Sequence, residues 1–158
     1  MKIFFTKFIL RARWLILLVA LILVVSSLGG CAGTKSSKID LNKMAPMSDM
    51  PPDIQKAPTV VQEAYQFAVA NPDALKNVPC YCGCGAVGHT SNYSCYVQEV
   101  KDSGEIVFDQ HALGCSLCVD ISQDVMRLTS EGKTPQEIRG TIDQTYSQYG
   151  PSNMEASQ

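Results

Sequence analysis

The chain lacks the residue patterns of the common hydrolases and nucleotide-binding enzymes. It has no Gly-x-Ser-x-Gly, no His-Glu-x-x-His and no glycine loop of the phosphate-binding kind. At 158 residues it has room for one modest domain with appendages, and no internal repeat is visible. We therefore expect one domain with a binding role rather than hydrolytic chemistry.

Acidic residues are missing from the first 30 positions, which hold Lys2, Lys7, Arg11 and Arg13. The formal charge of −2 for the whole chain thus conceals a more acidic remainder. Such a remainder lacks the basic surface that binds nucleic acid, so we expect no nucleic-acid partner. An acidic surface suits a cation ligand instead.

An unbroken apolar run long enough to span a bilayer is absent too. The run Trp14–Val25 has 12 residues, against the roughly 20 that a spanning helix needs. Basic residues precede it and small residues follow it, which is the order of an export signal. The alternative, a longer membrane anchor from Phe4 to Val25, is interrupted by Arg11 and Arg13.

The segment Leu28-Gly29-Gly30-Cys31 resembles the lipobox of bacterial lipoproteins, in which the cysteine is acylated and the chain is cut just before it. We interpret residues 1–30 as a signal peptide and Cys31 as the lipidated residue, carrying palmitate or a similar acyl chain. The remainder would then be held by its lipid on the extracytoplasmic face of a membrane, in the cell envelope.

Residues 31–58 show no apolar periodicity and are rich in Lys, Ser, Asp, Met and Pro. This composition predicts a flexible tether after the lipidated cysteine. Within it, Met44, Met47 and Met50 recur at a spacing of three. Thioether sulfur is a soft ligand for Cu(I), so the three methionines form a candidate weak outer metal relay. The alternative is a chance cluster in a linker.

A folded domain is expected over residues 59–151, followed by a disordered tail over 152–158. Thr59 and Gln62 offer a capping box for a first helix that ends near Asn71-Pro72. A second helix should close at Gly132, and its apolar face is Leu117, Ile121, Val125 and Leu128.

A third long helix has the strongest end signals, with Thr134 as cap, Pro135 at its first position and Glu137 completing the box. Its expected buried stripe is Ile138, Ile142, Tyr146 and Tyr149. Between the first helix and the second, residues 93–100 fit a helix and residues 104–109 a short strand. The fold class is therefore mainly α, a small helical domain with a cysteine-rich loop and a minor extended element.

Six cysteines remain once Cys31 is assigned to lipid. They are Cys80, Cys82, Cys84, Cys95, Cys115 and Cys118. An even number in a small exported domain is compatible with three disulfides and a structural role. Cys80, Cys82 and Cys84 argue against local pairing, because residues two apart in an extended chain are about 6.6 Å apart at Cα, near the limit of disulfide reach. The same spacing projects three thiols to one side of the chain, where they could converge on one ion.

The only two histidines flank these thiols, since His89 follows Cys84 by five residues and His111 precedes Cys115 by four. Cys115 and Cys118 lie at the start of the expected second helix, where thiol pKa values fall and metal binding or redox exchange is favoured. Thiolates, imidazoles and thioethers together describe a soft-metal site, with Cu(I) first and Zn(II) second. Eight thiol and imidazole ligands exceed the four of one tetrahedral zinc ion, so more than one ion, or a mixture of metal and disulfide, remains open.

The run Pro79-Cys80-Tyr81-Cys82-Gly83-Cys84, with His89, Cys95, His111, Cys115 and Cys118 after it, resembles the bacterial PCYCGC-motif lipoproteins. The resemblance covers roughly residues 61–149. It implies the lipid anchor and the limits of the domain, and it implies no activity, because that family is defined by its motif.

Two functions remain. The first is a binding or relay protein for a soft metal, with the six cysteines, His89 and His111 as ligands and a metal donor or acceptor protein as partner. The second is a thiol-disulfide exchange protein in which Cys115 attacks and Cys118 resolves the mixed disulfide. Against the second, the Cys-x-x-Cys pair does not follow a strand.

Overall fold

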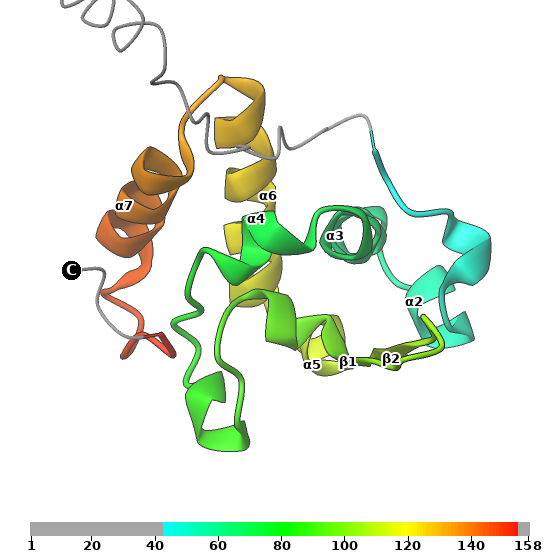
Figure 1. Cartoon of the computed structure of the whole chain (residues 1–158). Coiled ribbons are helices and arrows are strands. Elements are labelled where there is room, and N and C mark those ends of the chain that lie inside the picture. The colour runs from blue at the N-terminus through cyan, green and yellow to red at the C-terminus, as the bar shows by residue number, and fades with distance from the viewer. Residues whose placement is uncertain (1–42, 155–158) are drawn as a thin grey trace, which may run out of the picture. The chain divides into compact units, whose positions relative to one another are not determined.

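The computed structural model describes residues 43–154 (Figure 1). These residues belong to one compact unit of the chain, Lys38–Gln158. The expected signal peptide, Cys31, the first part of the expected tether and residues 155–158 of the expected tail lie outside the described residues.

The described part of the chain is mainly α, with a minor extended element, as the sequence predicts. Its α-helices are α2 (Pro52–Gln55), α3 (Thr59–Ala70), α4 (Pro72–Lys76), α5 (His111–Gly114), α6 (Ser116–Ser130) and α7 (Pro135–Tyr146). Three short 3-10 helices are η1 (Met47–Asp49), η2 (Cys84–Val87) and η3 (Tyr93–Cys95), and the strands are β1 (Val97–Val100) and β2 (Ile106–Phe108). Within residues 43–154, no helix has both the length and the apolar character needed to cross a membrane.

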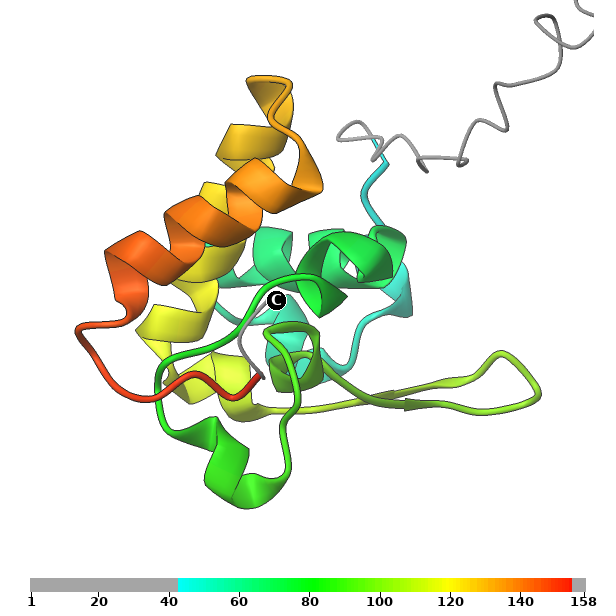
Figure 2. The same cartoon turned by 60° about the vertical axis from the view of Figure 1, so that its left-hand side comes forward.

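The core lies where α6 packs against α3 on one side and α7 on the other (Figures 1 and 2). Helix α6 buries its apolar face as expected, with Ile121, Val125 and Leu128 at 0 to 4 % exposure and Leu117 half-buried. Helix α3 contributes Tyr65 and Phe67, whose side chains are fully buried. Burial of these faces, rather than local preference alone, stabilises the three helices.

The ends of α7 confirm most of the expected signals. Thr134 accepts a hydrogen bond from the Glu137 amide at 3.3 Å, and the Glu137 carboxylate accepts one from the Thr134 amide at 2.8 Å. Ile138, Ile142 and Tyr146 are buried. The prediction for Tyr149 is wrong, because α7 ends at Tyr146 and the following turn leaves Tyr149 62 % exposed.

The expected capping box at the start of α3 is wrong. The cap position is Pro58, and no side-chain hydrogen bond caps the helix. The Gln62 side chain donates instead to the carbonyl oxygens of Gln55 and Ala57, both at 2.8 Å. Gln62 thus joins α3 to the segment before it.

That segment is packed, so the prediction of a flexible tether is wrong for its described part. Met50 and Ile54 are 3 % and 1 % exposed and belong to the hydrophobic core. Ala45 pairs with Gln66 of α3 through its amide and through its carbonyl oxygen. The composition is polar, but a few well-spaced apolar side chains suffice to anchor it on α3.

Residues 93–100 form η3 and strand β1, and the expected helix there is wrong. β1 pairs antiparallel with β2, with Val97 opposite Phe108 and Val100 opposite Ile106. Gly104, with a φ of 85°, makes the connecting turn. The short strand expected at 104–109 is confirmed, and pairing with it draws the two β-branched valines into a hairpin that projects from the helices (Figure 2).

Candidate metal centre

The Pro-Cys-Tyr-Cys-Gly-Cys loop begins after α4 and carries its three thiols into the interior. Cys80 and Cys84 are buried and Cys82 is half-buried. Gly83 and Gly88, with φ of 83° and 92°, bracket η2 and turn the chain back. These left-handed positions favour glycine, so the two glycines let the loop turn back on itself.

Cys115 and Cys118 come from the first turn of α6, where Cys115 occupies the cap position. Cys118 is fully buried, whereas Cys115 is half-buried. His111 opens the short helix α5 just before them. The expected placement of the Cys-x-x-Cys pair at a helix start is therefore confirmed.

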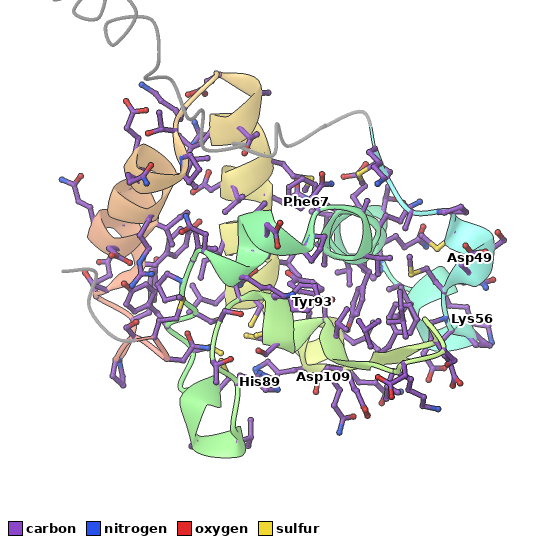
Figure 3. All side chains as sticks on the ribbon, in the orientation of Figure 1. Asp49, Lys56, Phe67, His89, Tyr93 and Asp109 are labelled. Carbon is purple, nitrogen blue, oxygen red and sulfur yellow. The ribbon has the colours of Figure 1, made fainter. Side chains whose placement is uncertain are left out.

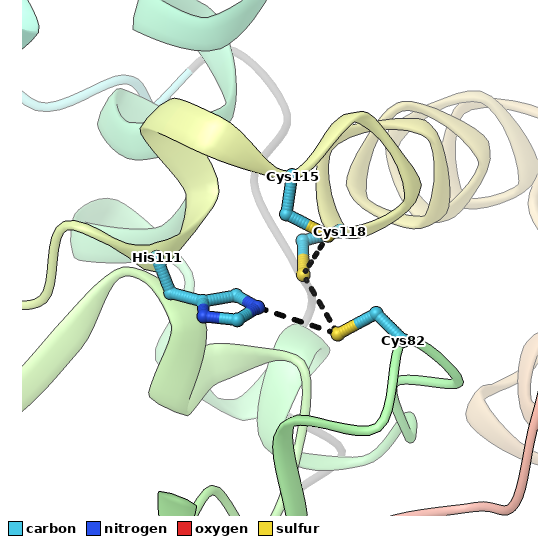
Figure 4. Close-up of side chains that lie close together, drawn as sticks. All are labelled: Cys82, His111, Cys115 and Cys118. Atoms are coloured by element: carbon cyan, nitrogen blue, oxygen red, sulfur yellow. Dashed lines mark hydrogen bonds between the residues drawn. The ribbon is translucent and has the colours of Figure 1, made fainter.

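A first group of ligand atoms joins the loop to these helices. It consists of Cys82, His111, Cys115 and Cys118, and all four ligand atoms lie within 4.8 Å of one another. Figure 4 shows the Cys82 sulfur between His111 Nε2, at 3.4 Å, and the Cys118 sulfur, at 3.7 Å. The Cys115 sulfur lies 3.3 Å from that of Cys118. Three sulfurs and one imidazole nitrogen are the number and kind of ligands that a tetrahedral zinc ion binds.

A second group consists of Cys80, Cys84 and Cys95, again with all ligand atoms within 4.8 Å. All three cysteines are buried. Cys95 comes from η3, and its sulfur lies 3.8 Å from that of Cys84. The two groups, which we call the cysteine cluster, thus bring together all six expected cysteines and His111.

His89 lies beside the cysteine cluster rather than in either group (Figure 3). Its Nδ1 is 3.5 Å from the Cys95 sulfur, and its Nε2 is 3.4 Å from the Asp109 carboxylate. The His89 and His111 rings meet edge to face with centroids 5.1 Å apart. An imidazole whose outer nitrogen faces a carboxylate has a fixed ring orientation.

All six cysteines are free, and within residues 43–154 no disulfide joins any pair. The sulfur-sulfur contacts range from 3.2 Å, for Cys80 and Cys118, to 3.8 Å, for Cys84 and Cys95. A disulfide would need about 2.05 Å. Two thiolates on one tetrahedral ion, each about 2.3 Å from it, lie about 3.8 Å apart. The spacing can therefore hold a metal ion with small adjustments.

A buried polar network fixes Cys118, and the sequence analysis did not find it. The Cys118 carbonyl oxygen accepts hydrogen bonds from Tyr96 Oη at 2.8 Å and from Asn92 Nδ2 at 3.2 Å. Ser122 donates to Asn92 Oδ1 at 2.8 Å. Asn92, Tyr96 and Ser122 are each fully buried, so this part of the network is shielded from water. No local pattern in the sequence indicates hydrogen bonds between residues this far apart.

Two further polar residues hold the loops, and they also escaped the sequence analysis. Asn153 accepts a hydrogen bond from the Cys80 amide at 2.7 Å and donates to the Ser91 carbonyl at 3.3 Å. Asp109 accepts one from the His111 amide at 2.7 Å while its other oxygen faces His89. The Asp-x-His spacing was a signal for Asp109. No sequence signal pointed to Asn153. Because its hydrogen bonds anchor this segment, the expectation of disorder is wrong for residues 152–154.

Charge is unevenly distributed among the thiols. Hydrogen bonding with Cys118 and Cys95 holds the pKa of Cys80 far below its usual value. The hydrogen bonds with Cys80 and Cys95, together with burial, raise the pKa of Cys118. Burial, followed by the hydrogen bond with Cys80, likewise raises the pKa of Cys82. The metal-free cysteine cluster thus carries few thiolates, and binding a metal ion must release protons.

The three methionines of the expected outer relay belong to the segment that precedes α3 and packs against the core. Met50 is buried, and Met44 and Met47 pack half-buried against the core. In Figure 3, Asp49 at the end of η1 and His89 lie on different sides of α3. Because Met50 is buried, its thioether is closed to an incoming ion. Of the three methionines, Met44 and Met47 keep exposed surface.

A family model described as "Protein of unknown function with PCYCGC motif" matches residues 16–155. No curated protein and no solved structure matches the chain.

Proposed function

The chain belongs to the PCYCGC-motif family, and we propose that it is a lipid-anchored, extracytoplasmic protein that binds or relays a soft metal ion, copper before zinc. It acts by binding and not as an enzyme. One observation carries the proposal: six thiols and an imidazole, from elements far apart in the sequence, converge in two groups with ligand spacing.

The ligand set favours a soft ion. Six of the seven ligand atoms of the cysteine cluster are sulfur, and thiolates prefer Cu(I) and Zn(II) to harder ions such as Mg²⁺ or Ca²⁺. Cu(I) ranks first and Zn(II) second because thiolates are soft ligands, which suit Cu(I) best. Carboxylates take no place in either group.

The difference in burial between the two groups supports a relay. Cys82, His111 and Cys115 are half-buried, whereas Cys80, Cys84 and Cys95 are buried. Cys115 also lines a cavity of about 300 Å³ between the start of α3 and the start of α6, with Val61, Leu113 and Val119 among its walls. A donor or acceptor protein can therefore present a ligand to Cys115 without unfolding the site.

The placement outside the cytoplasm rests on the sequence before the domain. The basic start, the apolar run and the Leu-Gly-Gly-Cys segment that ends at Cys31 support export followed by acylation. A lipid at Cys31 would hold the metal-binding domain close to the membrane surface.

Thiol-disulfide exchange is the second candidate, and one observation favours it. Cys115 caps α6 and is half-buried, while Cys118, 3.3 Å away between sulfurs, is buried. This is the arrangement of an attacking and a resolving thiol. The remaining thiols would then have no role in turnover.

Cys82→Ser and Cys115→Ser separate the two functions. Cys82 belongs to the first group of ligands but not to the Cys-x-x-Cys pair. We expect Cys82→Ser to lower Cu(I) affinity at least tenfold in competition with a chelator. Disulfide turnover should be equally low in the wild type and in the variant. If Cys82→Ser keeps full copper affinity and Cys115→Ser abolishes disulfide turnover, thiol-disulfide exchange becomes the function and metal binding is refuted.

A further inference from the structure

The second group of ligands is one short of a closed tetrahedral site. Cys80, Cys84 and Cys95 supply three sulfurs. His89 contacts Cys95 but falls outside the group, and its outer nitrogen faces Asp109. Within residues 43–154, the second group has no fourth His, Cys, Asp or Glu of its own.

The sulfur of Cys118 lies against both groups. It is 3.3 Å from the sulfur of Cys115 in its own group, and it is 3.2 Å from that of Cys80 and 3.3 Å from that of Cys95 in the other. These separations are equal within 0.1 Å. Cys118 is therefore as much a neighbour of the second group as a member of the first.

The backbone holds this central position firmly. Cys118 is fully buried, and the hydrogen bonds from Tyr96 and Asn92 to its carbonyl oxygen fix the first turn of α6. The side chain leaves that turn toward the middle of the cysteine cluster, as Figure 4 shows for the first group. Its two sets of neighbours thus arise from the fold and not from a mobile side chain.

A thiolate sulfur has enough lone pairs to bind two ions at once. We propose that the cysteine cluster holds two metal ions and that the Cys118 thiolate bridges them, an inference that rests on the proposed function. One ion is bound by Cys82, His111, Cys115 and Cys118. The other is bound by Cys80, Cys84, Cys95 and Cys118. Each cysteine that is still protonated gives its proton to solvent when it binds the ion.

The two sites differ in access. The first has the half-buried ligands Cys82, His111 and Cys115, and the second has buried ligands. The first ion exchanges with partners, while the second stays in place and keeps the Cys118 thiolate charged. His89 and Asp109 lie beside the second site, where they limit the movement of Cys95.

Cobalt(II) tests the shared thiolate, because it occupies tetrahedral thiolate sites and its unpaired electrons report on a neighbouring ion. The full-length chain, solubilised in detergent without oxygen, is titrated with cobalt(II) and followed by EPR spectroscopy and by metal content. We expect two cobalt ions per chain. The EPR signal should grow with the first ion and fall with the second, because the bridging sulfur couples the two sets of electron spins.

Three variants locate the bridge. Cys115→Ser and Cys84→Ser, matched controls that remove a ligand from one site each, should bind one cobalt ion tightly and give an uncoupled signal. Cys118→Ser should abolish spin coupling at any loading. The wild-type spectrum decides on its own between coupled and separate ions, so the test does not depend on the folding of Cys118→Ser.

Fewer than two cobalt ions per wild-type chain, or two ions whose signals add, would overturn the shared thiolate. In either case, retained Cu(I) affinity in chelator competition would leave the proposed function standing. A chain that takes up neither ion would overturn both.

Discussion

Asn153 tests how the segment after α7 holds the PCYCGC loop. Its Oδ1 accepts the hydrogen bond of the Cys80 amide at 2.7 Å, and its Nδ2 donates to the Ser91 carbonyl at 3.3 Å. In Asn153→Ala the amide of Cys80, a residue with no exposed surface, loses its partner. Leaving a buried donor unpaired costs about 1–3 kcal/mol, and the second bond adds about 1 kcal/mol.

We therefore expect Asn153→Ala to lower the free energy of unfolding by about 2–4 kcal/mol, a large share of the roughly 5–15 kcal/mol of a small domain. At about 4 °C for each kcal/mol in a domain of this size, the midpoint of thermal unfolding should fall by about 8–16 °C. The measurement is thermal unfolding of the reduced, metal-free protein followed by circular dichroism.

The matched control is Asn77→Ala, which removes an exposed hydrogen bond to the Pro135 carbonyl at 2.9 Å. Water can replace that partner, so the loss should stay below about 1 kcal/mol. If Asn153→Ala unfolds at the same temperature as Asn77→Ala, the amide of Cys80 does not depend on Asn153, and the argument for an anchored tail fails.

Four further variants test other features of the protein. Cys31→Ser should abolish labelling by a fatty-acid analogue and leave the domain folded, and unchanged labelling with membrane retention would refute the lipid anchor. Ile54→Ala, at a side chain 1 % exposed, should cost about 2–5 kcal/mol in denaturant unfolding, whereas a segment that merely tethers the domain would tolerate it at no cost. Gly150→Ala would place a Cβ 2.7 Å from the Tyr81 carbonyl oxygen and so displace the loop, lowering both stability and Cu(I) affinity. Gly140→Ala, with nothing within 4 Å, should stabilise α7 by about 0.5–1 kcal/mol, and equal effects of the two glycine variants would count against the close approach.

The helices could be predicted where local signals and burial agree. Thr134, Pro135 and Glu137 mark the start of α7 by hydrogen bonds between residues three apart, which the sequence displays directly. The apolar face of α6 follows from periodicity in the same way. The apolar residues at Val97 and Val100 fit either a helix or a strand. Pairing with β2 makes this segment a strand, and that pairing is a contact across a turn that local periodicity does not show.

The candidate site could be predicted as a set of residues but not as an arrangement. Thiols spaced by two and by three, with histidines near them, indicated a soft-metal site. How Cys118 comes to lie between Cys80 and Cys115 depends on the packing of η3 and the PCYCGC loop on α6. The same holds for Asn92 and Asn153, whose partners lie 26 and 73 residues away. Polar composition was misleading before Thr59, because it hides the few apolar side chains that anchor the segment.

The central claim is that the six thiols of the domain hold metal rather than one another. Purification of the full-length chain without oxygen, followed by metal analysis and a count of free thiols after denaturation with a chelator, tests it most directly. The account predicts bound copper or zinc and six free thiols among Cys80, Cys82, Cys84, Cys95, Cys115 and Cys118. Three disulfides and no metal would contradict it.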